Sequence, residues 1–224
     1  MKPHHGPSDE RSPARTRYPL KRPLDVALSL LGLVLLFLPT AVISLLVLLT
    51  LGRPILFRQR RPGLSARPFT MLKFRTMRQG TGSDAERLTR FGRLLRITSL
   101  DELPELWNVL KGDMSLVGPR PLLPEYVPFY TARERKRFDV LPGITGWSQI
   151  HGRNVPPWNE RLARDVWYAE HQSFGLDMRI LWMTIGRVLR REGIGEDSNL
   201  AEERRGFGHQ PEGGQQGQAR GESA

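Results

Sequence analysis

Residues 24–51 read LDVALSLLGLVLLFLPTAVISLLVLLTL, a nearly continuous apolar run with an abrupt change of composition on either side. In helical form a run of this length reaches across the hydrocarbon region of a bilayer, which is about 30 Å thick. It is too long for the core of a signal peptide, and the residues that follow, Arg53, Pro54 and Ile55, offer no small-residue cleavage site. The run therefore predicts a retained membrane segment.

Pro39 stands near the middle of this run, where its missing N–H kinks a helix. The kink divides the run into arms of roughly 20 Å, each shorter than the hydrocarbon core. Both flanks are basic, which favours placing both ends in the cytoplasm and hence a re-entrant hairpin. A single span with a mild proline kink remains the alternative. The flanking charges are Arg11, Arg15, Arg17, Lys21, Arg22, Arg53, Arg58, Arg60, Arg61 and Arg67.

The whole chain has 224 residues and a formal net charge of +11, enough for one sizeable domain with an anion-attracting surface. Charge alone leaves nucleic acid, anionic lipid and phosphorylated small molecules as partners. The sequence has no cysteine, which excludes disulfides and thiolate chemistry. Its five histidines are scattered, so we expect any metal to be a hard cation on oxygen ligands.

The remaining sequence predicts an α+β, helix-dominated catalytic domain that follows the re-entrant membrane helix. We expect a basic disordered arm over 1–22, the membrane helix over 23–52, the cytosolic-face catalytic domain over 53–194 and a disordered tail over 195–224. Within the domain, strands are predicted at 54–59 and 67–77. Helices are predicted at 85–97, 103–110, 124–138, 158–171 and 176–191.

Two adjacent carboxylates, Asp101 and Glu102, lie in TSLDELPELWNVLKGDMSLVGPRP, residues 98–121. One interpretation is structural: Ser99 and Glu102 would form a capping box at the start of a helix. The other is catalytic. The helix end and nearby cations would keep Asp101 ionised, while Glu102 would supply an oxygen ligand to Mg²⁺. The two interpretations are compatible, because a cap can also position a nucleophile.

Two arginines are candidate phosphate clamps. Prolines on both sides of Arg120 restrict its backbone, which reduces the entropy lost when the guanidinium binds phosphate, although a turn with an incidental arginine fits as well. Arg153 follows the glycine-rich loop 142–146, which could cradle a diphosphate or only turn a corner. Lys73 and Arg75 share one side of a predicted strand, where alternating surface charge is the simpler explanation.

Five segments together resemble the bacterial sugar transferase family, the monotopic phosphoglycosyl transferases. They are KRPLD (21–25), FRQRRPG (57–63), FTMLKFRTM (69–77), the 98–121 segment and LPGITGWSQIHGRN (141–154), with a tryptophan and Asp165 downstream. The resemblance covers about residues 20–190. It implies a re-entrant helix broken at a proline, a requirement for Mg²⁺, a covalent phosphosugar on Asp101 and a metal bound by Glu102. It further implies phosphate contacts from Arg96, Arg120 and Arg153.

The activity implied is transfer of a sugar 1-phosphate from a UDP-sugar to polyprenyl (undecaprenyl) phosphate, with release of UMP. Such an enzyme would sit on the cytoplasmic face of the bacterial inner membrane and begin a surface glycan. The alternative is a non-catalytic, membrane-tethered binder of anionic lipid or nucleic acid, which would not need an Asp–Glu pair amid arginines. We therefore expect no nucleic-acid partner. The sugar and the oligomeric state stay open.

The sequence departs from the family pattern at three positions. Leu38 precedes Pro39 where a serine is common, so Pro39 must break the helix without help from a hydroxyl. His151 stands where an asparagine is common and Ile97 where an arginine is common, which affects fine positioning of the donor. No catalytic group is lost. The five-helix membrane module of larger members does not occur, so the chain resembles the minimal catalytic form.

Overall fold

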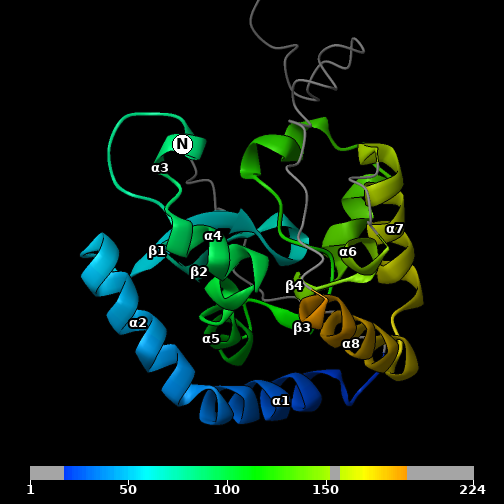
Figure 1. The fold of residues 1–224 in the computed structure, drawn as a ribbon. Helices are drawn as coiled ribbons and strands as arrows, with labels where there is room; N and C mark the ends of the chain where they lie inside the picture. Colours follow the sequence, from blue (N-terminus) through cyan, green and yellow to red (C-terminus); the bar gives the residue numbers. More distant parts are fainter. Residues whose placement is uncertain (1–17, 152–156, 191–224) are drawn as a thin grey trace, which may run out of the picture.

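The protein, seen in a computed structural model that describes residues 18–151 and 157–190, is a helix-rich α+β domain bordered by an apolar helix pair (Figure 1). Its helices are α1 (Lys21–Leu35), α2 (Phe37–Leu51), α3 (Asp84–Arg87), α4 (Arg90–Ile97), α5 (Glu105–Lys111), α6 (Trp147–Ile150), α7 (Trp158–His171) and α8 (Phe174–Leu189). Four short 3-10 turns connect them: η1 (Leu64–Ala66), η2 (Leu100–Glu102), η3 (Pro124–Phe129) and η4 (Glu134–Asp139). The predicted arm and tail lie largely or wholly outside the described residues.

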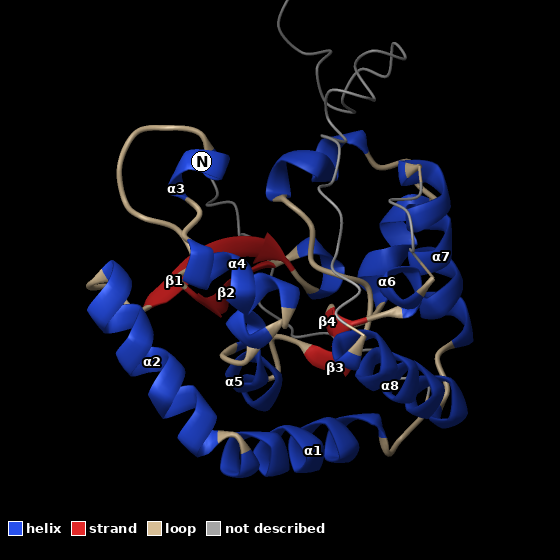
Figure 2. Ribbon diagram, viewed as in Figure 1, coloured by secondary structure: helices blue, strands red, loops and turns tan. Residues whose placement is uncertain are grey.

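Two small sheets lie inside the helical frame (Figure 2). Strands β1 (Leu56–Pro62) and β2 (Pro68–Phe74) form an antiparallel hairpin joined by η1, close to the two strands expected from the sequence. Strands β3 (Ser115–Val117) and β4 (Gly143–Thr145) pair in parallel. Because each is three residues long and their partners lie far apart in the chain, no local pattern marked this second sheet.

The apolar run forms two helices that meet at an angle of 63°. The break falls at Leu36, three residues before Pro39. A proline ring collides with the carbonyl four residues earlier, here that of Leu35, so the bend arises where Pro39 requires it. The predicted division of the run is confirmed. Among the described helices none is by itself long and apolar enough to cross a bilayer, whereas this bent pair passes by length and composition.

One face of α1 is polar and small, although the helix lies in the apolar run. Lys21, Asp25 and Ser29 follow at four-residue intervals and are at most 2% exposed. Gly32 continues the stripe, and a Cβ built there would stand 3.3 Å from Leu106 of α5. The helix pair thus docks on the domain through this stripe. Its outward residues stay exposed and apolar, among them Leu30, Leu31, Val34, Leu35, Phe37, Leu38, Val42, Leu45 and Leu49.

The basic residues at the start of α1 are used inside the protein. Lys21 Nζ lies 2.6 Å from Asp177 Oδ2 of α8 and donates to the Val117 carbonyl at 3.0 Å. Arg22 donates to the carbonyls of Val109 and Leu110 at the end of α5. Both charges belong to the basic flank that was predicted to precede a membrane segment, but here they bind the protein and not lipid. Because their partners lie in the domain that follows α2, the start of α1 lies on the same side of the helix pair as that domain.

Removing Asp177 is expected to destabilise the fold strongly. In Asp177→Ala, Lys21 would keep only the more distant Asp25 carboxylate at 3.6 Å, and the Tyr18 and Tyr168 hydroxyls would lose their acceptor. Breaking a buried ion pair in this way costs about 3–5 kcal/mol of unfolding free energy. Thermal unfolding of the purified protein in nanodiscs measures the change. Glu170→Ala is the matched control, because Glu170 pairs with Lys136 on the surface, where no measurable change is expected. Equal transition midpoints for Asp177→Ala and Glu170→Ala would contradict the buried anchor.

Two predicted helices are wrong in detail. The helix expected over 85–97 is divided into α3 and α4, because Thr89 caps α4 with its side chain and interrupts the preceding turn. A capping box does occur, but it is formed by Ser83 and Glu86 at the start of α3. The helix expected over 124–138 consists of η3 and η4, since Pro128 cannot continue an α-helix. Predictions for α5, α7 and α8 agree with the structure within two residues.

Candidate active site

Asp101 is held in a tight turn between α4 and α5. Ser99 adopts a left-handed backbone (φ 55°) that ends α4 and begins η2, which carries Asp101 and Glu102. The Ser99 side chain does not cap the turn, so the predicted Ser99–Glu102 capping box is wrong. Asp101 is only 8% exposed, and no described side chain donates a hydrogen bond to its carboxylate. Its oxygens are therefore free to react in the adjoining cavity.

Glu102 binds two cations through one oxygen. Its Oε1 accepts from Lys73 Nζ at 2.6 Å and from Arg120 Nη2 at 2.8 Å. Burial by itself would raise the pKa of Glu102, but the charges of Arg120 and Lys73 outweigh it and lower that pKa to about 2. Glu102 is thus ionised at neutral pH, and the predicted neighbours Lys73 and Arg120 meet at one point.

Burial raises the pKa of Asp101 to about 6, and the negative charge of Glu102 adds to this effect. Lys73, Arg120 and Arg96 oppose it only in part. The prediction that cations hold Asp101 in its ionised form is therefore corrected: burial outweighs the cations, and the pKa is raised and not lowered. At pH 7 the ionised form of a carboxyl with this pKa still exceeds the protonated form by roughly ten to one. Asp101 is a carboxylate with raised basicity, as suits a nucleophile.

Three glycines fix the backbone that carries Arg120. A Cβ at Gly118 would stand 2.3 Å from the Leu141 carbonyl oxygen, and one at Gly143 would stand 2.1 Å from the Gly118 nitrogen. A Cβ at Gly146 would stand 2.2 Å from the Gly118 carbonyl oxygen. These contacts bring β3 and β4 together, so the 142–146 loop packs against the strand end that precedes Arg120. The structure therefore favours the turning role for this loop over a diphosphate cradle.

A buried ion pair fixes the backbone of Arg120. Arg137 Nη2 donates to the Arg120 carbonyl and to Asp165 Oδ2, both at 2.7 Å, and Ser148 donates to the other Asp165 oxygen at 2.6 Å. Arg137 and Asp165 are 2% and 1% exposed. Sequence reasoning did not single out Arg137, because it lies in the charged run 133–137. The only signal was Asp165 on the apolar face of α7.

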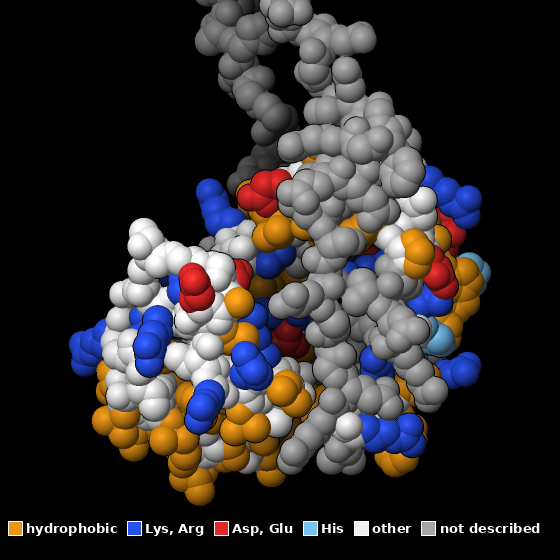
Figure 3. All heavy atoms as spheres, turned by 45° about the horizontal axis from the view of Figure 1, so that its top comes forward, with side chains coloured by type: hydrophobic (Ala, Val, Ile, Leu, Met, Phe, Trp, Pro, Cys, Tyr) orange, Lys and Arg blue, Asp and Glu red, His pale blue; other side chains and the backbone are white. Residues whose placement is uncertain are grey.

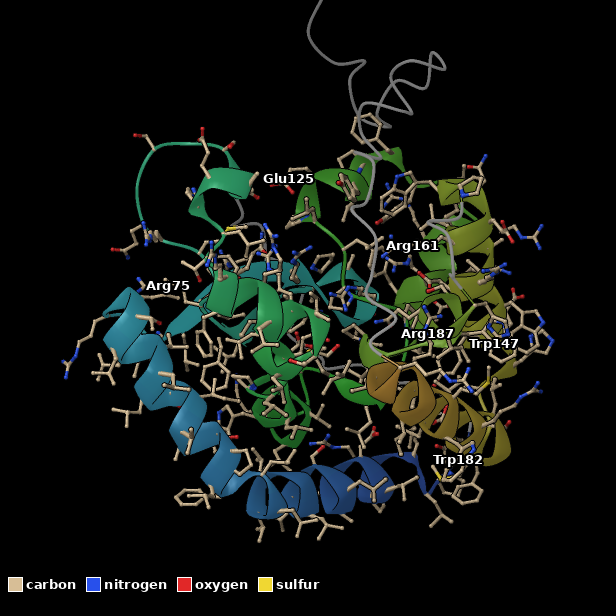
Figure 4. The ribbon with its side chains drawn as sticks, viewed as in Figure 1. Arg75, Glu125, Trp147, Arg161, Trp182 and Arg187 are labelled. Carbon is tan, nitrogen blue, oxygen red and sulfur yellow. The ribbon has the colours of Figure 1, made fainter. Side chains whose placement is uncertain are left out.

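The other predicted cations occupy different places. Arg96 donates to the Thr76 hydroxyl at 3.1 Å and lines the same cavity as Asp101. Arg75 is 6% exposed, and its guanidinium donates to the carbonyls of residues 51, 52 and 53 at the end of α2 (Figure 4). This geometry favours a structural role for Arg75, and its predicted part in substrate binding stays untested. Arg153 lies outside the described residues.

Two polar residues of α5 were missed from the sequence. Glu105 is 2% exposed, with Oε1 3.2 Å from Lys73 Nζ. Asn108, fully buried, accepts from the Leu72 N–H at 3.0 Å and donates to the Thr70 carbonyl at 2.8 Å. It fastens α5 to β2 and so sets the position of Lys73. Their signal was the spacing of Asp101, Glu105 and Asn108, four and then three residues apart, which places polar groups on the buried side of α5.

One cleft joins the carboxylates to the apolar helix pair. It has a volume of about 1710 Å³ and is lined by Asp101, Glu102, Lys73, Arg96 and Arg120. The same cleft extends to side chains of α1 and α2, namely Leu33, Thr40, Ser44 and Leu48. Figure 3 shows acidic side chains in a central hollow with basic ones around it, and apolar side chains gathered along the lower edge. A polar reaction site and an apolar surface therefore share one opening.

The site fits a magnesium ion bound together with substrate. The described residues contain no group of three or more His, Cys, Asp or Glu side chains that could hold a metal by themselves. Mg²⁺ is commonly held by one or two carboxylates, substrate phosphates and water. Asp101 and Glu102 provide that minimum, because Lys73 and Arg120 occupy only one oxygen of Glu102. Mg²⁺ binding itself stays a prediction.

Comparison with known proteins agrees with this site. The family described as bacterial sugar transferase matches residues 16–191 of the sequence. The chain belongs to the bacterial sugar transferase family. This membership confirms the resemblance and the predicted class of enzyme, a phosphoglycosyl transferase. The matched range covers every described residue of the candidate site.

Three relatives show how closely the sequence of this sugar transferase resembles those of known proteins. The uncharacterized sugar transferase EpsL of Bacillus subtilis (strain 168) is 52% identical over 164 residues, which cover 70% of this chain and 81% of EpsL. The UDP-glucose:undecaprenyl-phosphate glucose-1-phosphate transferase of Caulobacter vibrioides is 40% identical, with coverages of 75% and 69%. The UDP-galactose-lipid carrier transferase of Erwinia amylovora is 37% identical, but the match spans only 41% of its length.

Proposed function

We propose that this sugar transferase moves a sugar 1-phosphate from a UDP-sugar to polyprenyl (undecaprenyl) phosphate and releases UMP. The observation that carries the proposal is the single cleft that joins the Asp101–Glu102 pair and its cations to the apolar helix pair. A soluble anionic donor and an insoluble lipid phosphate must meet at one point, and this cleft provides both surroundings. The names of the relatives support the same substrate classes.

In the first step an Asp101 oxygen attacks the phosphorus that bears the sugar. The bond from that phosphorus to the UMP oxygen breaks, and UMP leaves with the electron pair. In the second step a phosphate oxygen of the lipid attacks the same phosphorus, and the Asp101 oxygen departs as a carboxylate. Atoms balance, because the enzyme returns unchanged and the lipid gains the phosphosugar.

Cations of the site have separate tasks in this reaction. Arg120 and Lys73 are already held at Glu102, where they can bind the donor phosphates with little loss of side-chain entropy. Arg96 faces the cleft from α4 and stabilises negative charge near Asp101. Bound Mg²⁺, for which Glu102 is the proposed ligand, would supply further neutralisation of the diphosphate. Arg153 is proposed as a second phosphate clamp.

We further propose that α1 and α2 enter the bilayer as a re-entrant hairpin in the bacterial inner membrane. Each helix is about 22 Å long at 1.5 Å per residue, shorter than a hydrocarbon core of about 30 Å. The 63° bend and the exposed apolar outer faces support insertion from one side. The catalytic domain would then lie on the cytoplasmic face.

The hairpin predicts that both flanks are cytoplasmic. Because the chain has no cysteine, Ser12→Cys and Ser65→Cys each introduce a single reporter thiol. In intact cells a membrane-impermeant thiol reagent should label neither variant, and after permeabilisation it should label both. Labelling of position 12 in intact cells, with position 65 protected, would show a full span instead.

Nucleotide release tests the proposed activity. Purified protein in nanodiscs with Mg²⁺, a UDP-sugar and polyprenyl phosphate should release UMP over many turnovers. Without the lipid, release should stop near one equivalent per enzyme, because the phosphosugar remains on Asp101. A panel of UDP-sugars in this assay also identifies the donor. A lack of UMP with every donor would favour the alternative of a non-catalytic membrane binder.

A further inference from the structure

A second, smaller cavity adjoins the main cleft. Its volume is about 270 Å³, and it shares Arg61, Met71, Lys73 and Arg120 with the cleft, whereas Asp101 and Glu102 line the cleft alone. The shared cations therefore stand at the border between the two spaces. At about 30 Å³ per water molecule, the cavity has room for about nine waters, which suits a ring system and is too small for a whole polyprenyl chain.

The cavity presents an acceptor, a donor and aromatic walls. Glu105 lines it, is 2% exposed, and has no hydrogen-bond partner for Oε1 among the described residues. Arg61 of β1 is a second polar group in the lining, with its guanidinium bonded to Gln59 at 2.7 and 3.1 Å. Tyr126 and Trp158 complete the wall, edge to face with ring centres 5.5 Å apart.

This lining suits a flat heterocycle with both donors and acceptors. A buried oxygen without a hydrogen bond is costly, and a ligand N–H removes that cost. Aromatic side chains provide faces and edges against which a ring can pack. Figure 4 labels Glu125 on η3 and Arg161 on α7, the two elements that bring Tyr126 and Trp158 to the cavity. The competing explanation for the burial of Glu105 is that its Oε1, 3.2 Å from Lys73 Nζ, balances the charge of Lys73.

The geometry of in-line displacement indicates which part of the donor lies in the small cavity. The nucleophile and the leaving group stand on opposite sides of the phosphorus, and Asp101 approaches from the main cleft. With the diphosphate at Lys73 and Arg120, the departing nucleotide points beyond these cations, toward the small cavity. The sugar, attached through a different oxygen, stays in the main cleft.

We propose that the small cavity binds the pyrimidine base of the donor nucleotide, with Glu105 accepting the uracil N3–H and Arg61 donating to a ring carbonyl. The inference rests on the proposed function, because only a UDP-sugar donor places uracil at this point. The proposal also predicts which nucleotide the small cavity prefers. Neutral cytosine has no N3–H, so Glu105 should favour uridine over cytidine nucleotides.

Binding of UMP, CMP and inorganic diphosphate to the full chain in nanodiscs, measured by calorimetry, tests this assignment. Glu105→Leu and Arg61→Gln should each weaken UMP binding about tenfold, the loss typical of one hydrogen bond. Neither should weaken diphosphate binding more than twofold, and loss of the carboxylate 3.2 Å from Lys73 in Glu105→Leu should, if anything, strengthen it. Glu105→Leu should also remove the preference for UMP over CMP, and Glu105→Gln should keep UMP binding near that of the wild type, since the amide oxygen still accepts from N3–H.

Arg60→Gln is the matched control, because Arg60 is the exposed neighbour of Arg61 on β1 and should leave all three affinities unchanged. An equal loss of diphosphate and UMP affinity would overturn the inference, because Glu105 and Arg61 would then act through the phosphates. Unchanged UMP binding with altered rates between UDP-glucose and UDP-galactose would overturn it in favour of a sugar site. Wild-type protein that does not bind UMP would overturn the proposed function itself. Arg61→Gln keeps the test valid if Glu105→Leu fails to fold.

Discussion

Asp101→Asn is expected to abolish turnover, with a loss of about a thousandfold or more, the scale seen when an enzyme loses its nucleophile. An amide is nearly the same shape as a carboxylate but a poor nucleophile. Folding and membrane insertion should be kept, because no described side chain hydrogen bonds to the Asp101 carboxylate. Steady-state UMP release measures the effect. Glu102→Gln should lose less activity and regain part of it in excess Mg²⁺, since its proposed role is metal binding.

The same substitution should stabilise the folded protein at high pH. The raised pKa of Asp101, about 6 against an ordinary 3.8, means that the folded state favours the protonated form. That stability is present below the ordinary pKa and is lost as pH rises through 6, by about 3 kcal/mol. Asp101→Asn escapes the loss, so its unfolding temperature should exceed that of the wild type at pH 8 and approach it near pH 4. No difference at pH 8 would contradict the raised pKa.

Arg120→Lys is expected to reduce turnover about a hundredfold, the scale for loss of one donor that stabilises a transition state. Lysine keeps the charge but not the planar fork that can bind Glu102 and a phosphate together. Arg120 Nη2 lies 2.8 Å from Glu102, and Arg137 fixes its backbone, so the fork cannot move to compensate. The comparison uses UMP release under saturating donor.

Arg133→Lys is the control for Arg120→Lys, because Arg133 is exposed and its substitution likewise keeps the positive charge. It should leave turnover unaltered. Near-normal rates for both variants would return Arg120 to the role of a solvated charge in a turn. A loss in Arg120→Lys alone would support its role as a phosphate clamp.

Local sequence patterns predicted the elements that depend on local physics. The apolar run and Pro39 predicted the bent helix pair, and Gly112 after Lys111 predicted the end of α5, where it adopts φ 90°. The carboxylate pair and Arg120 were also found, because charged residues in unusual turns are visible in sequence. Lys73 was a candidate from its side of a predicted strand, although surface charge alternation was the simpler explanation there. These predictions needed no knowledge of distant contacts.

The rest depends on contacts between distant segments. Arg75 and Lys73 lie close together in the sequence, yet one caps the end of α2 and the other reaches Glu102, because β2 ends between them at Phe74. Arg137 and Asp165 meet across 28 positions, so neither position alone indicates a pair. The pKa of Asp101 likewise depends on burial, which its neighbours in sequence do not reveal.

Detection of the covalent intermediate is the sharpest test of the proposed two-step transfer through Asp101. Enzyme incubated with a sugar-labelled UDP-sugar and Mg²⁺, without polyprenyl phosphate, should carry label on the peptide that contains Asp101, and added lipid phosphate should remove it. Peptide mass spectrometry locates the label, and Asp101→Asn should acquire none. Label on Asp101→Asn, or UMP release by that variant at a rate comparable to wild type, would contradict the account.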